Sequence, residues 1–367
     1  MRTFRVTSSA GAYTIHCGEG ALTQAPRLID RLGDSTGVFV LSSSKVWRHW
    51  GRTLAKTIPG RKDPILFDDR ESAKRLATVE SIARQLVRAR ADRRAIVVAV
   101  GGGVVGDVAG FAAATYLRGV RLVHIPTTVV AQVDSSIGGK TGVDLREGKN
   151  LVGAFYPPEL VVVDPAFLRT LPHREYRSGL YEVIKYGVIA DPALFDFLAR
   201  RMDAILRRDP KALAYVIQRS IAIKARIVSA DERESGLRQI LNFGHTLGHA
   251  FETATKYRRF LHGEAIGWGM IAATLLAVAR GKLNDASAIR VMRLIASVGP
   301  LPSLRGVRAG AIRPILASDK KTRGGRVRWV LPRRIGKTEW GIEVPWPVVA
   351  RTIAELPQIA SYAGLKA

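Results

Sequence analysis

The order of apolar and polar positions divides the chain into two regions with different periodicities. Up to residue 165, short β-branched runs alternate with helical patterns. Strands are expected at 37–43, 95–100, 121–128 and 159–165, and an amphipathic helix at 72–91. Strands bounded by helices at this spacing indicate a mostly parallel, doubly wound sheet.

After residue 170 the strand signals nearly vanish and long helical patterns follow. The expected helices cover 178–189, 192–207, 210–231, 239–256, 263–280 and 285–297. A late strand pair, RVRWVLP and KTEWGIEV, precedes a last helix near 346–355. We therefore predict a Rossmann-like α/β domain at 1–170 and a mostly α-helical domain at 171–367, with the active site in the cleft between them.

A glycine-rich segment, AVGGGVVGDVAGFAAA (99–114), follows a predicted strand and opens a helix. Gly101, Gly103 and Gly106 satisfy GxGxxG, a spacing that lets the backbone approach a pyrophosphate at a helix N-terminus. The acidic residue expected about 20 positions later is missing. The next strand instead leads into IPTTVVAQVDSSIGGKTG, which supplies Thr127, Thr128, Asp134 and Lys140. The pattern favours a bound dinucleotide, and a simple tight turn remains the alternative.

Two segments of the helical region carry candidate chemistry. Glu182 and Lys185 are three residues apart and share a helical face, either pointing inward or forming a surface ion pair. Arg238, Asn242, His245 and His249 step by four, three and four, which predicts that all four share one helical face. That face is too polar for a core stripe, and we expect it to meet a ligand, a metal or water.

The histidines suggest a metal site. His245 and His249 stand one helical turn apart, and this spacing alone favours them as a pair of zinc ligands. His262 follows within the same segment, and Glu182 offers a carboxylate. Two histidines, one carboxylate and an open position form a catalytic zinc arrangement, but the spacing does not say which two histidines take part.

Composition narrows the class of protein. The chain has 367 residues, 47% of them apolar and 24% charged, with a single Cys17 that excludes an internal disulfide. The N-terminus lacks a signal-like apolar run, and the apolar stretch 265–279 falls short of the ~20 residues of a membrane helix, so we expect a buried core helix in a cytoplasmic protein. The formal charge of +26 favours an anionic partner. Because Lys and Arg are spread along the chain, we expect neither nucleic acid nor membrane as that partner.

Six motifs occur in the order typical of one family. They are GGGVVGDVAGFAAATYLRG, PTTVVAQVDSSIGGKTG, GKNLVGAFYPP, EVIKYG, LNFGHTLGHAFE and HGEA. Between about residues 60 and 325 the chain resembles the 3-dehydroquinate synthase family of sugar phosphate cyclases. The resemblance implies a homodimeric shikimate-pathway lyase that uses NAD and one divalent metal, usually zinc, with cobalt as the alternative. The implied substrate is a seven-carbon sugar acid phosphate.

The resemblance also implies roles for particular residues. The metal ligands become Glu182, His245 and His262, which moves His249 from the metal to the substrate. Substrate contacts are implied for Lys140, Asn150, Lys185, Lys224, Arg238, Asn242, His249, one of Lys320 and Lys321, and Arg118, the last reaching a partner subunit. Cofactor contacts are implied for Asp69, Glu71, Lys74, Gly103, Val104, Val105, Gly106, Asp107, Thr127, Thr128, Lys140, Lys149, Phe167, Leu168, Arg169 and Thr170. Lys185 and Asp134 are expected to move protons at the oxidised carbon.

The reaction implied by the family converts 3-deoxy-D-arabino-heptulosonate 7-phosphate into 3-dehydroquinate and phosphate. It runs through transient oxidation by NAD, β-elimination of phosphate, re-reduction and intramolecular aldol closure. Three features depart from the family pattern: Ser42–Ser44 where Asp or Asn is usual, and the bulky Tyr181 and Trp268 where smaller residues are usual.

Three alternatives compete with this interpretation. A cyclase that forms valiolone or deoxy-inosose rings would keep the cofactors, but Lys224, Arg238, Asn242 and His249 favour a carboxylated substrate. A polyol phosphate dehydrogenase is disfavoured by the phosphate and carboxylate contacts and by Glu182 in place of Asp. A nucleic acid binder on a degenerate enzyme scaffold is motivated by the charge alone.

Overall fold

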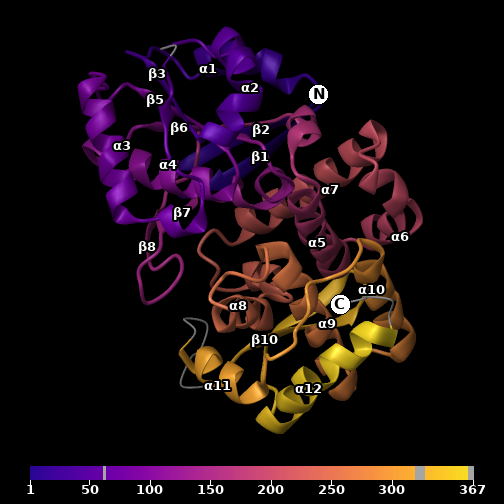
Figure 1. The fold of residues 1–367 in the computed structure, drawn as a ribbon. Helices are drawn as coiled ribbons and strands as arrows, with labels where there is room; N and C mark the ends of the chain where they lie inside the picture. The colour runs from indigo at the N-terminus through magenta and orange to yellow at the C-terminus, as the bar shows by residue number, and fades with distance from the viewer. Residues whose placement is uncertain (61–62, 319–326, 363–367) are drawn as a thin grey trace. The chain divides into compact units, whose positions relative to one another are not determined.

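The computed structural model describes residues 1–60, 63–318 and 327–362 (Figure 1). The chain forms two compact units. Unit 1 comprises Met1–Leu171 together with Ser220–Glu232, and unit 2 comprises Pro172–Arg219 together with Arg233–Ala367.

Unit 1 is built on a seven-stranded sheet of order β1-β2-β9-β6-β5-β3-β4. Its strands are β1 (Arg2–Ser8), β2 (Gly11–Cys17), β3 (Val38–Ser42), β4 (Ile65–Leu66), β5 (Ile96–Gly101), β6 (Arg121–Pro126) and β9 (Leu160–Val163). Every neighbouring pair is parallel except β1 with β2. The four predicted strands are therefore present, and the sheet is mostly parallel as expected.

The apolar side chains of the central strands alternate between two cores, because successive residues of a strand point to opposite faces. Phe39 and Leu41 of β3 pack with α3 and α4, whereas Val38 and Val40 pack with α1 and α2. These helices are α1 (Ala25–Asp30), α2 (Ser44–Thr57), α3 (Leu76–Arg88) and α4 (Gly103–Thr115). Helices therefore cover both faces of the sheet, which explains why its strands are almost continuously apolar.

Shorter elements complete unit 1. A second hairpin joins β7 (Lys140–Val143) to β8 (Val152–Phe155). The short helices are η1 (Ala21–Gln24), η2 (Glu71–Ala73), η3 (Tyr116–Arg118), η4 (Ala131–Ser135) and η5 (Pro165–Thr170).

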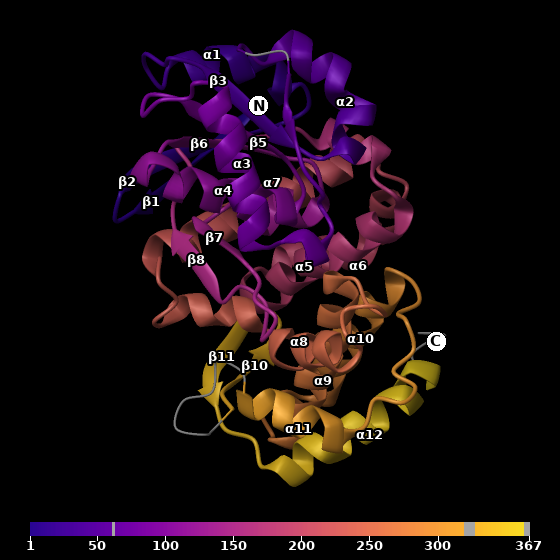
Figure 2. The same ribbon diagram turned by 60° about the vertical axis from the view of Figure 1, so that its left-hand side comes forward.

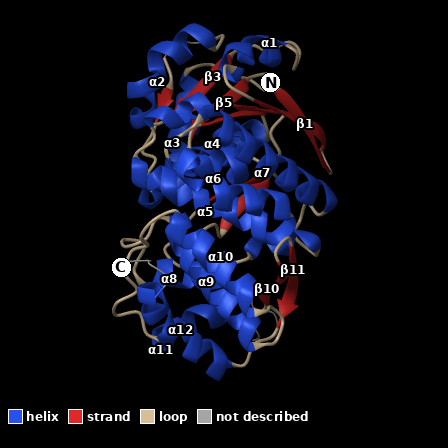
Figure 3. Ribbon diagram, turned by 90° about the vertical axis from the view of Figure 1, so that its right-hand side faces the viewer, coloured by secondary structure: helices blue, strands red, loops and turns tan. Residues whose placement is uncertain are grey.

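In its described residues, unit 2 is almost entirely helical, with one antiparallel strand pair (Figure 3). Its helices are α5 (His173–Ala190), α6 (Pro192–Leu206), the first part of α7 (Pro210–Ala230), η6 (Leu237–Asn242), α8 (His245–Ala254), α9 (His262–Ala279), α10 (Asp285–Ser297), α11 (Ala309–Ser318) and α12 (Trp346–Tyr362), and its strands are β10 (Trp329–Arg334) and β11 (Lys337–Ile342). Figure 2 shows α9 among α8, α10 and α12. By length and composition α9 is apolar enough to span a membrane, but 78% of that window is buried inside the protein, which confirms the prediction of a core helix.

The division of the chain differs from the predicted boundary in one respect. The prediction assigned all of 171–367 to the second domain, whereas Ser220–Glu232 groups with unit 1. The amides of Thr7 and Ser9 in the β1–β2 hairpin donate to Ser229 Oγ at 2.9 Å and to Glu232 Oε2 at 2.8 Å. The apolar period of α7 runs through this point without a break, so the sequence carries no local sign of it.

The predicted helix 239–256 is wrong. The structure has the short helix η6, then a break at Phe243 and Gly244, and then α8. Gly244 has φ of 81°, a left-handed conformation that a continuous helix cannot contain. Arg238 and Asn242 therefore do not lie on the same helical face as His245 and His249.

Candidate functional site

Three histidines converge in unit 2. His245 is the first residue of α8, His249 lies one turn later, and His262 is the first residue of α9. One ring nitrogen from each lies within 4.8 Å of the others. The ring centroids are 5.3 Å apart for His245 and His249, and 5.4 Å apart for His245 and His262.

Glu182 brings a carboxylate to the same place from α5. Its Oε1 lies 3.4 Å from Nε2 of His262 and 3.6 Å from Nε2 of His245. Its Oε2 forms an ion pair with Lys185 Nζ at 2.5 Å, and both side chains are only 1% exposed. The pair therefore points inward, and the alternative of a surface ion pair is excluded.

Two glycines let the helices approach closely enough to assemble this cluster. A Cβ on Gly263 would lie 1.8 Å from the carbonyl oxygen of Ser178, so only glycine permits this contact between α9 and α5. Gly244, in a left-handed conformation, precedes α8 as its N-cap, and a Cβ on it would lie 2.6 Å from Cγ of Met270 in α9. As a result, His262 lies immediately before the residue that contacts α5, and His245 begins α8 beside α9.

Glu252 is a functional candidate that the sequence analysis did not assign. Its Oε2 lies 3.4 Å from Nδ1 of His262, on the opposite side of the ring from the Glu182 contact. Burial disfavours the charged imidazole, but hydrogen bonding to the Glu182 and Glu252 carboxylates and their negative charges outweigh burial and raise the pKa of His262 to about 10. The available signal was the position of Glu252, seven residues after His245 and thus on the same face of α8.

The donor set fits a divalent metal. Imidazole nitrogens and a carboxylate oxygen are ligands typical of zinc, and a catalytic zinc keeps a further position open. The Glu252 contact resembles the carboxylate–histidine pairs that orient metal-bound imidazoles. Two ligand sets are chemically reasonable at these distances. One consists of Glu182, His245 and His262, and the other of the three histidines.

The glycine loop of unit 1 has the geometry of an anion site. β5 ends at Gly101, and α4 begins at Gly103 with its first-turn amides directed toward the loop. A Cβ on Gly102 would lie 3.0 Å from Cγ2 of Thr128, and one on Gly103 would lie 3.3 Å from Oγ of Ser135. Thr128 thus stands directly beside the loop.

The position of this loop in the sheet also favours ligand binding. The chain passes from β3 outward to β4 and then returns to β5 on the other side of β3. In open α/β sheets ligands bind at the carboxyl ends of the strands where such a reversal occurs. The amide of Thr127 donates to the carbonyl of Gly101 at 2.9 Å, which fixes the end of β6 beside the loop.

Several predicted cofactor and substrate residues of unit 1 form one network. Buried Lys74 donates to Asp107 Oδ2 at 2.5 Å and to Asn150 Oδ1. Burial works against the Lys74 cation, but Asp107 and Glu71 outweigh it and raise its pKa. Lys149 Nζ lies 3.1 Å from Glu71 of η2, so the 144–150 loop contacts both η2 and Lys74, the residue that follows it. Asp69 lies outside this network and pairs with Lys45 at 3.5 Å.

The Ser42–Ser44 segment is committed to the fold. The hydroxyl of Ser42 donates to the carbonyl of Val100 at 2.8 Å, and Ser43 caps α2 by accepting from the amide of Val46 at 3.3 Å. Both hydroxyls are therefore engaged within unit 1, whereas Ser44 is exposed.

The Phe167–Thr170 segment forms most of η5. Phe167 and Leu168 are buried, and Phe167 stacks against Trp50 with ring centroids 4.7 Å apart. Thr170 Oγ1 accepts from the Trp50 indole at 2.8 Å, and Arg169 pairs with Glu19 at 2.6 Å. Two of the four side chains thus belong to the core, so a cofactor would meet this segment through its backbone or through Arg169 and Thr170.

The remaining predicted residues are distributed between the units. Lys224 and Asp134 are paired at 2.8 Å in unit 1. In unit 2, Arg238 is buried in η6 and the amide of Asn242 donates to Glu234. Lys140 is exposed at the start of β7. Lys320 and Lys321 lie outside the described residues.

Arg118 occupies an unusual surface turn. Leu117 and Arg118 have φ of 49° and 68°, and both side chains are exposed. Two consecutive left-handed residues without a glycine are costly and tend to persist where function requires them.

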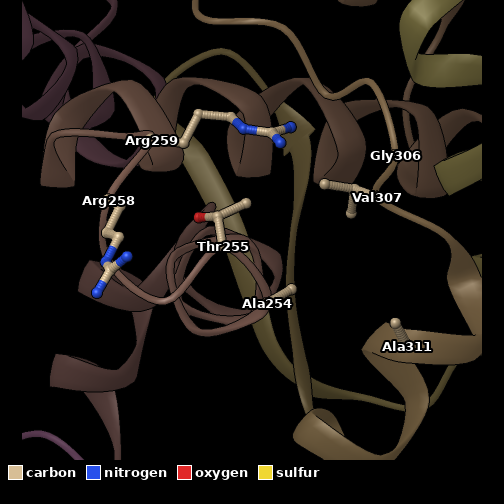
Figure 4. Close-up of a pocket in the computed structure, with 7 residues that line it drawn as sticks. All are labelled: Ala254, Thr255, Arg258, Arg259, Gly306, Val307 and Ala311. Carbon is tan, nitrogen blue, oxygen red and sulfur yellow. The ribbon is translucent and has the colours of Figure 1, made fainter.

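A hollow of about 270 Å³ lies elsewhere in unit 2 (Figure 4). It is lined by Ala254, Thr255, Arg258, Arg259, Gly306, Val307 and Ala311, none of which is a predicted site residue. Figure 4 shows the Arg259 side chain extending toward Gly306 and Val307.

Comparison with solved structures first defines the class. A 2-epi-5-epi-valiolone synthase from Streptomyces hygroscopicus subsp. jinggangensis, solved with NAD⁺ and Zn²⁺ bound, superimposes with a TM-score of 0.84 at 32% identity, covering 95% of this chain and 97% of that one. A 2-deoxy-scyllo-inosose synthase with carbaglucose-6-phosphate, NAD⁺ and Co²⁺ gives 0.86 at 29% identity, with 96% and 100% covered. The fold is that of the sugar phosphate cyclases.

Sequence comparison identifies the family within that class. The profiles of the 3-dehydroquinate synthase N-terminal and C-terminal regions match residues 64–178 and 179–322. The 3-dehydroquinate synthase of Koribacter versatilis is 45% identical over 98% of this chain and 99% of its own length, and that of Solibacter usitatus is 45% identical over 94% and 97%. The chain belongs to the 3-dehydroquinate synthase family.

Proposed function

We propose that this protein catalyses the reaction for which its relatives are named, converting 3-deoxy-D-arabino-heptulosonate 7-phosphate into 3-dehydroquinate and phosphate. The observation that carries the proposal is the convergence of His245 and His262 on the buried Glu182 in a chain 45% identical to curated 3-dehydroquinate synthases. The fold of unit 1 and its glycine loop support a dinucleotide as the second requirement.

Unit 2 would hold the metal through Glu182, His245 and His262, with zinc as the expected ion and cobalt as the alternative. Glu252 would fix the orientation of the His262 ring, and His249 would face the substrate. Unit 1 would hold NAD at the Gly103–Asp107 turn, with Thr127 and Thr128 beside it. The chemistry that the two groups supply when bound is Lewis acidity at a carbinol oxygen and reversible acceptance of hydride.

The protein side chains would position the substrate and move its protons. Arg238 and Lys224 are suited to the substrate carboxylate, and Lys140 and Asn150 to its phosphate, because cations and amides pair with these anions. Lys185 stands beside Glu182 and would exchange the proton of the hydroxyl group on the oxidised carbon, with Asp134 as a second group. Holding both ends of the substrate lowers the barrier mainly by orientation.

The family resemblance further supports a cytoplasmic homodimer in which Arg118 contacts the phosphate bound by the partner subunit. The exposed left-handed turn at Leu117 and Arg118 favours a role for this segment outside its own subunit. We expect neither a nucleic acid nor a membrane to be a functional partner.

One assay separates this proposal from its alternatives. Purified protein is given the heptulosonate phosphate and NAD while released phosphate and NADH absorbance are followed together, before and after removal of metal by a chelator. We expect phosphate release that requires metal and catalytic NAD, without accumulation of NADH. Accumulating NADH would indicate a dehydrogenase. No release from a protein that binds NAD and zinc would indicate an uncarboxylated sugar phosphate as the substrate.

A further inference from the structure

The segment from Val298 to Arg305, hereafter the strap, links α10 to α11 without forming a helix or a strand. Its backbone is held by side chains instead. The Arg177 guanidinium donates to the backbone carbonyls of Val298 at 2.8 Å and Pro300 at 3.2 Å. The Tyr181 hydroxyl donates to the carbonyl of Gly299 at 3.4 Å, and the Trp268 indole to that of Pro302 at 2.8 Å. The Arg259 guanidinium donates to the carbonyls of Ser303 at 3.2 Å and Arg305 at 2.7 Å.

The donors come from the elements that carry the histidine cluster. Arg177 and Tyr181 lie on α5, with Tyr181 directly before Glu182, and Trp268 lies on α9, which begins at His262. Arg259 belongs to the turn between α8 and α9. The strap is therefore bonded to the supports of Glu182 and His262 simultaneously.

Packing reinforces these bonds. A Cβ on Gly267 of α9 would lie 3.1 Å from the Tyr181 ring and 3.2 Å from Leu301 of the strap. The Trp268 side chain is completely buried, and Tyr181 is 1% exposed. Tyr181 and Trp268, the two residues that are larger than the family pattern, thus fill the space where α5 and α9 meet the strap. Because Gly267 has no side chain, it leaves room for the Tyr181 ring.

We propose that the strap sets the spacing of α5 and α9, so that Arg177, Tyr181 and Trp268 are positioning residues for the metal centre. The inference rests on the proposed function, since it concerns the metal expected there. The 3.4 Å separation of Glu182 and His262 depends on how closely α5 approaches α9. A loss of strap bonds gives both helices freedom to shift, and ligands displaced by a fraction of an ångström bind metal less tightly.

The test is zinc affinity of the full-length protein, measured by competition with a chromophoric chelator. Trp268→Phe removes one strap bond while retaining most of the ring volume. Arg177→Lys is the second variant. Lys lacks the forked guanidinium that reaches two carbonyls, and because position 177 is partly exposed, the fold should tolerate the substitution. We expect each variant to bind zinc about ten-fold more weakly than the wild type, as for other residues that orient metal ligands.

Tyr176→Phe is the matched control. Tyr176 also lies on α5 and its hydroxyl donates to a carbonyl, that of Ile205 at 2.5 Å, which belongs to α6 rather than the strap. This variant should lose thermal stability yet bind zinc like the wild type. Strap variants that lose stability to the same extent and keep wild-type zinc affinity would overturn the inference. A wild-type protein that does not bind zinc would instead remove the proposed metal centre and the inference with it.

Discussion

Lys185 is a buried cation beside the proposed metal ligands, and its burial bears on the role that we assign to it. Its ammonium group is 1% exposed and bonded to Glu182, so the cation is kept in the interior by its carboxylate partner. Burying an ion pair in this way costs free energy. The position of the pair beside the proposed metal ligands favours proton transfer as its role.

Replacement of Lys185 by Met keeps most of the side-chain volume and removes the ammonium group. We expect turnover to fall about 100-fold or more, the range typical of a lost general acid or base. Steady-state phosphate release measures the loss, and zinc content measured on the same sample shows whether the metal is retained. Turnover within a factor of two of the wild type, with zinc bound, would exclude Lys185 from proton transfer.

His124 gives stability a pH dependence. It is buried in β6, and burial lowers the pKa of its imidazole to about 4. The unfolded chain therefore binds this proton below about pH 6.5 while the folded protein does not, and stability is lost as the pH falls from about 6.5 to 4. The contribution approaches about 3 kcal/mol.

Denaturant unfolding at several pH values measures this effect. We expect His124→Gln to show a shallower loss of unfolding free energy between pH 6.5 and 4 than the wild type, even if it is less stable at pH 7. Parallel curves for the two proteins over that interval would show that other groups cause the pH dependence.

At the level of single residues, the sequence identified the chemistry better than the geometry. Residue type and spacing made the histidines, Glu182 and Lys185 candidates, and these side chains do meet. The choice of metal ligands among them came from the family resemblance and stays a prediction. Glu252 was missed because its place on the His245 face of α8 does not by itself reveal the contact with His262, which belongs to another helix. Ser42 and Ser43 were recognised as departures, but their bonds to Val100 and Val46 follow from the sheet and the α2 cap.

At the scale of elements, the contact of α5 with α9 depends on one missing side chain. Because a Cβ at Gly263 would come within 1.8 Å of the Ser178 carbonyl, the Gly263→Ala variant must push the two helices apart. We expect it to destabilise the protein by about 1–3 kcal/mol, the usual cost of overpacking.

Gly310→Ala provides the control, because a Cβ at this α11 position meets nothing within 4 Å. Alanine favours helix over glycine, so this variant should be neutral or slightly stabilising. Thermal unfolding of the two variants checks the difference. Equal melting temperatures for both would mean that the helices adjust without cost.

Elements with a strong period of their own were predicted, and those that depend on distant partners were not. The central strands and α5, α6 and α10 follow from local apolar runs. The β1–β2 and β7–β8 hairpins were missed, because short and partly exposed strands are defined by pairing rather than by burial. The break at Gly244 was missed because the apolar period continues through it and only the left-handed glycine interrupts the helix.

At the scale of the whole molecule, the charge of +26 makes weak attraction to any polyanion unavoidable. Attraction of this kind falls steeply with salt, since each phosphate contact releases counterions. A specific nucleic acid function would retain affinity at physiological salt and prefer some sequences.

We therefore expect binding to random duplex DNA only at low salt, with loss of measurable binding by about 200 mM. Fluorescence anisotropy against a salt series, on duplexes of different sequence, tests this expectation. Sequence-selective binding that survives at that salt concentration would revive the alternative of a nucleic acid binder.

The return of Ser220–Glu232 to unit 1 has a consequence for synthesis on the ribosome. A nascent chain that has just completed β9 and η5 still lacks the segment whose Ser229 and Glu232 receive the amides of the β1–β2 hairpin. The hairpin amides lack these acceptors until about sixty further residues have emerged from the ribosome at ~5–20 per second. Unit 1 therefore cannot complete its fold until the first part of unit 2 has been synthesised. Folding of the two units overlaps in time rather than proceeding one after the other.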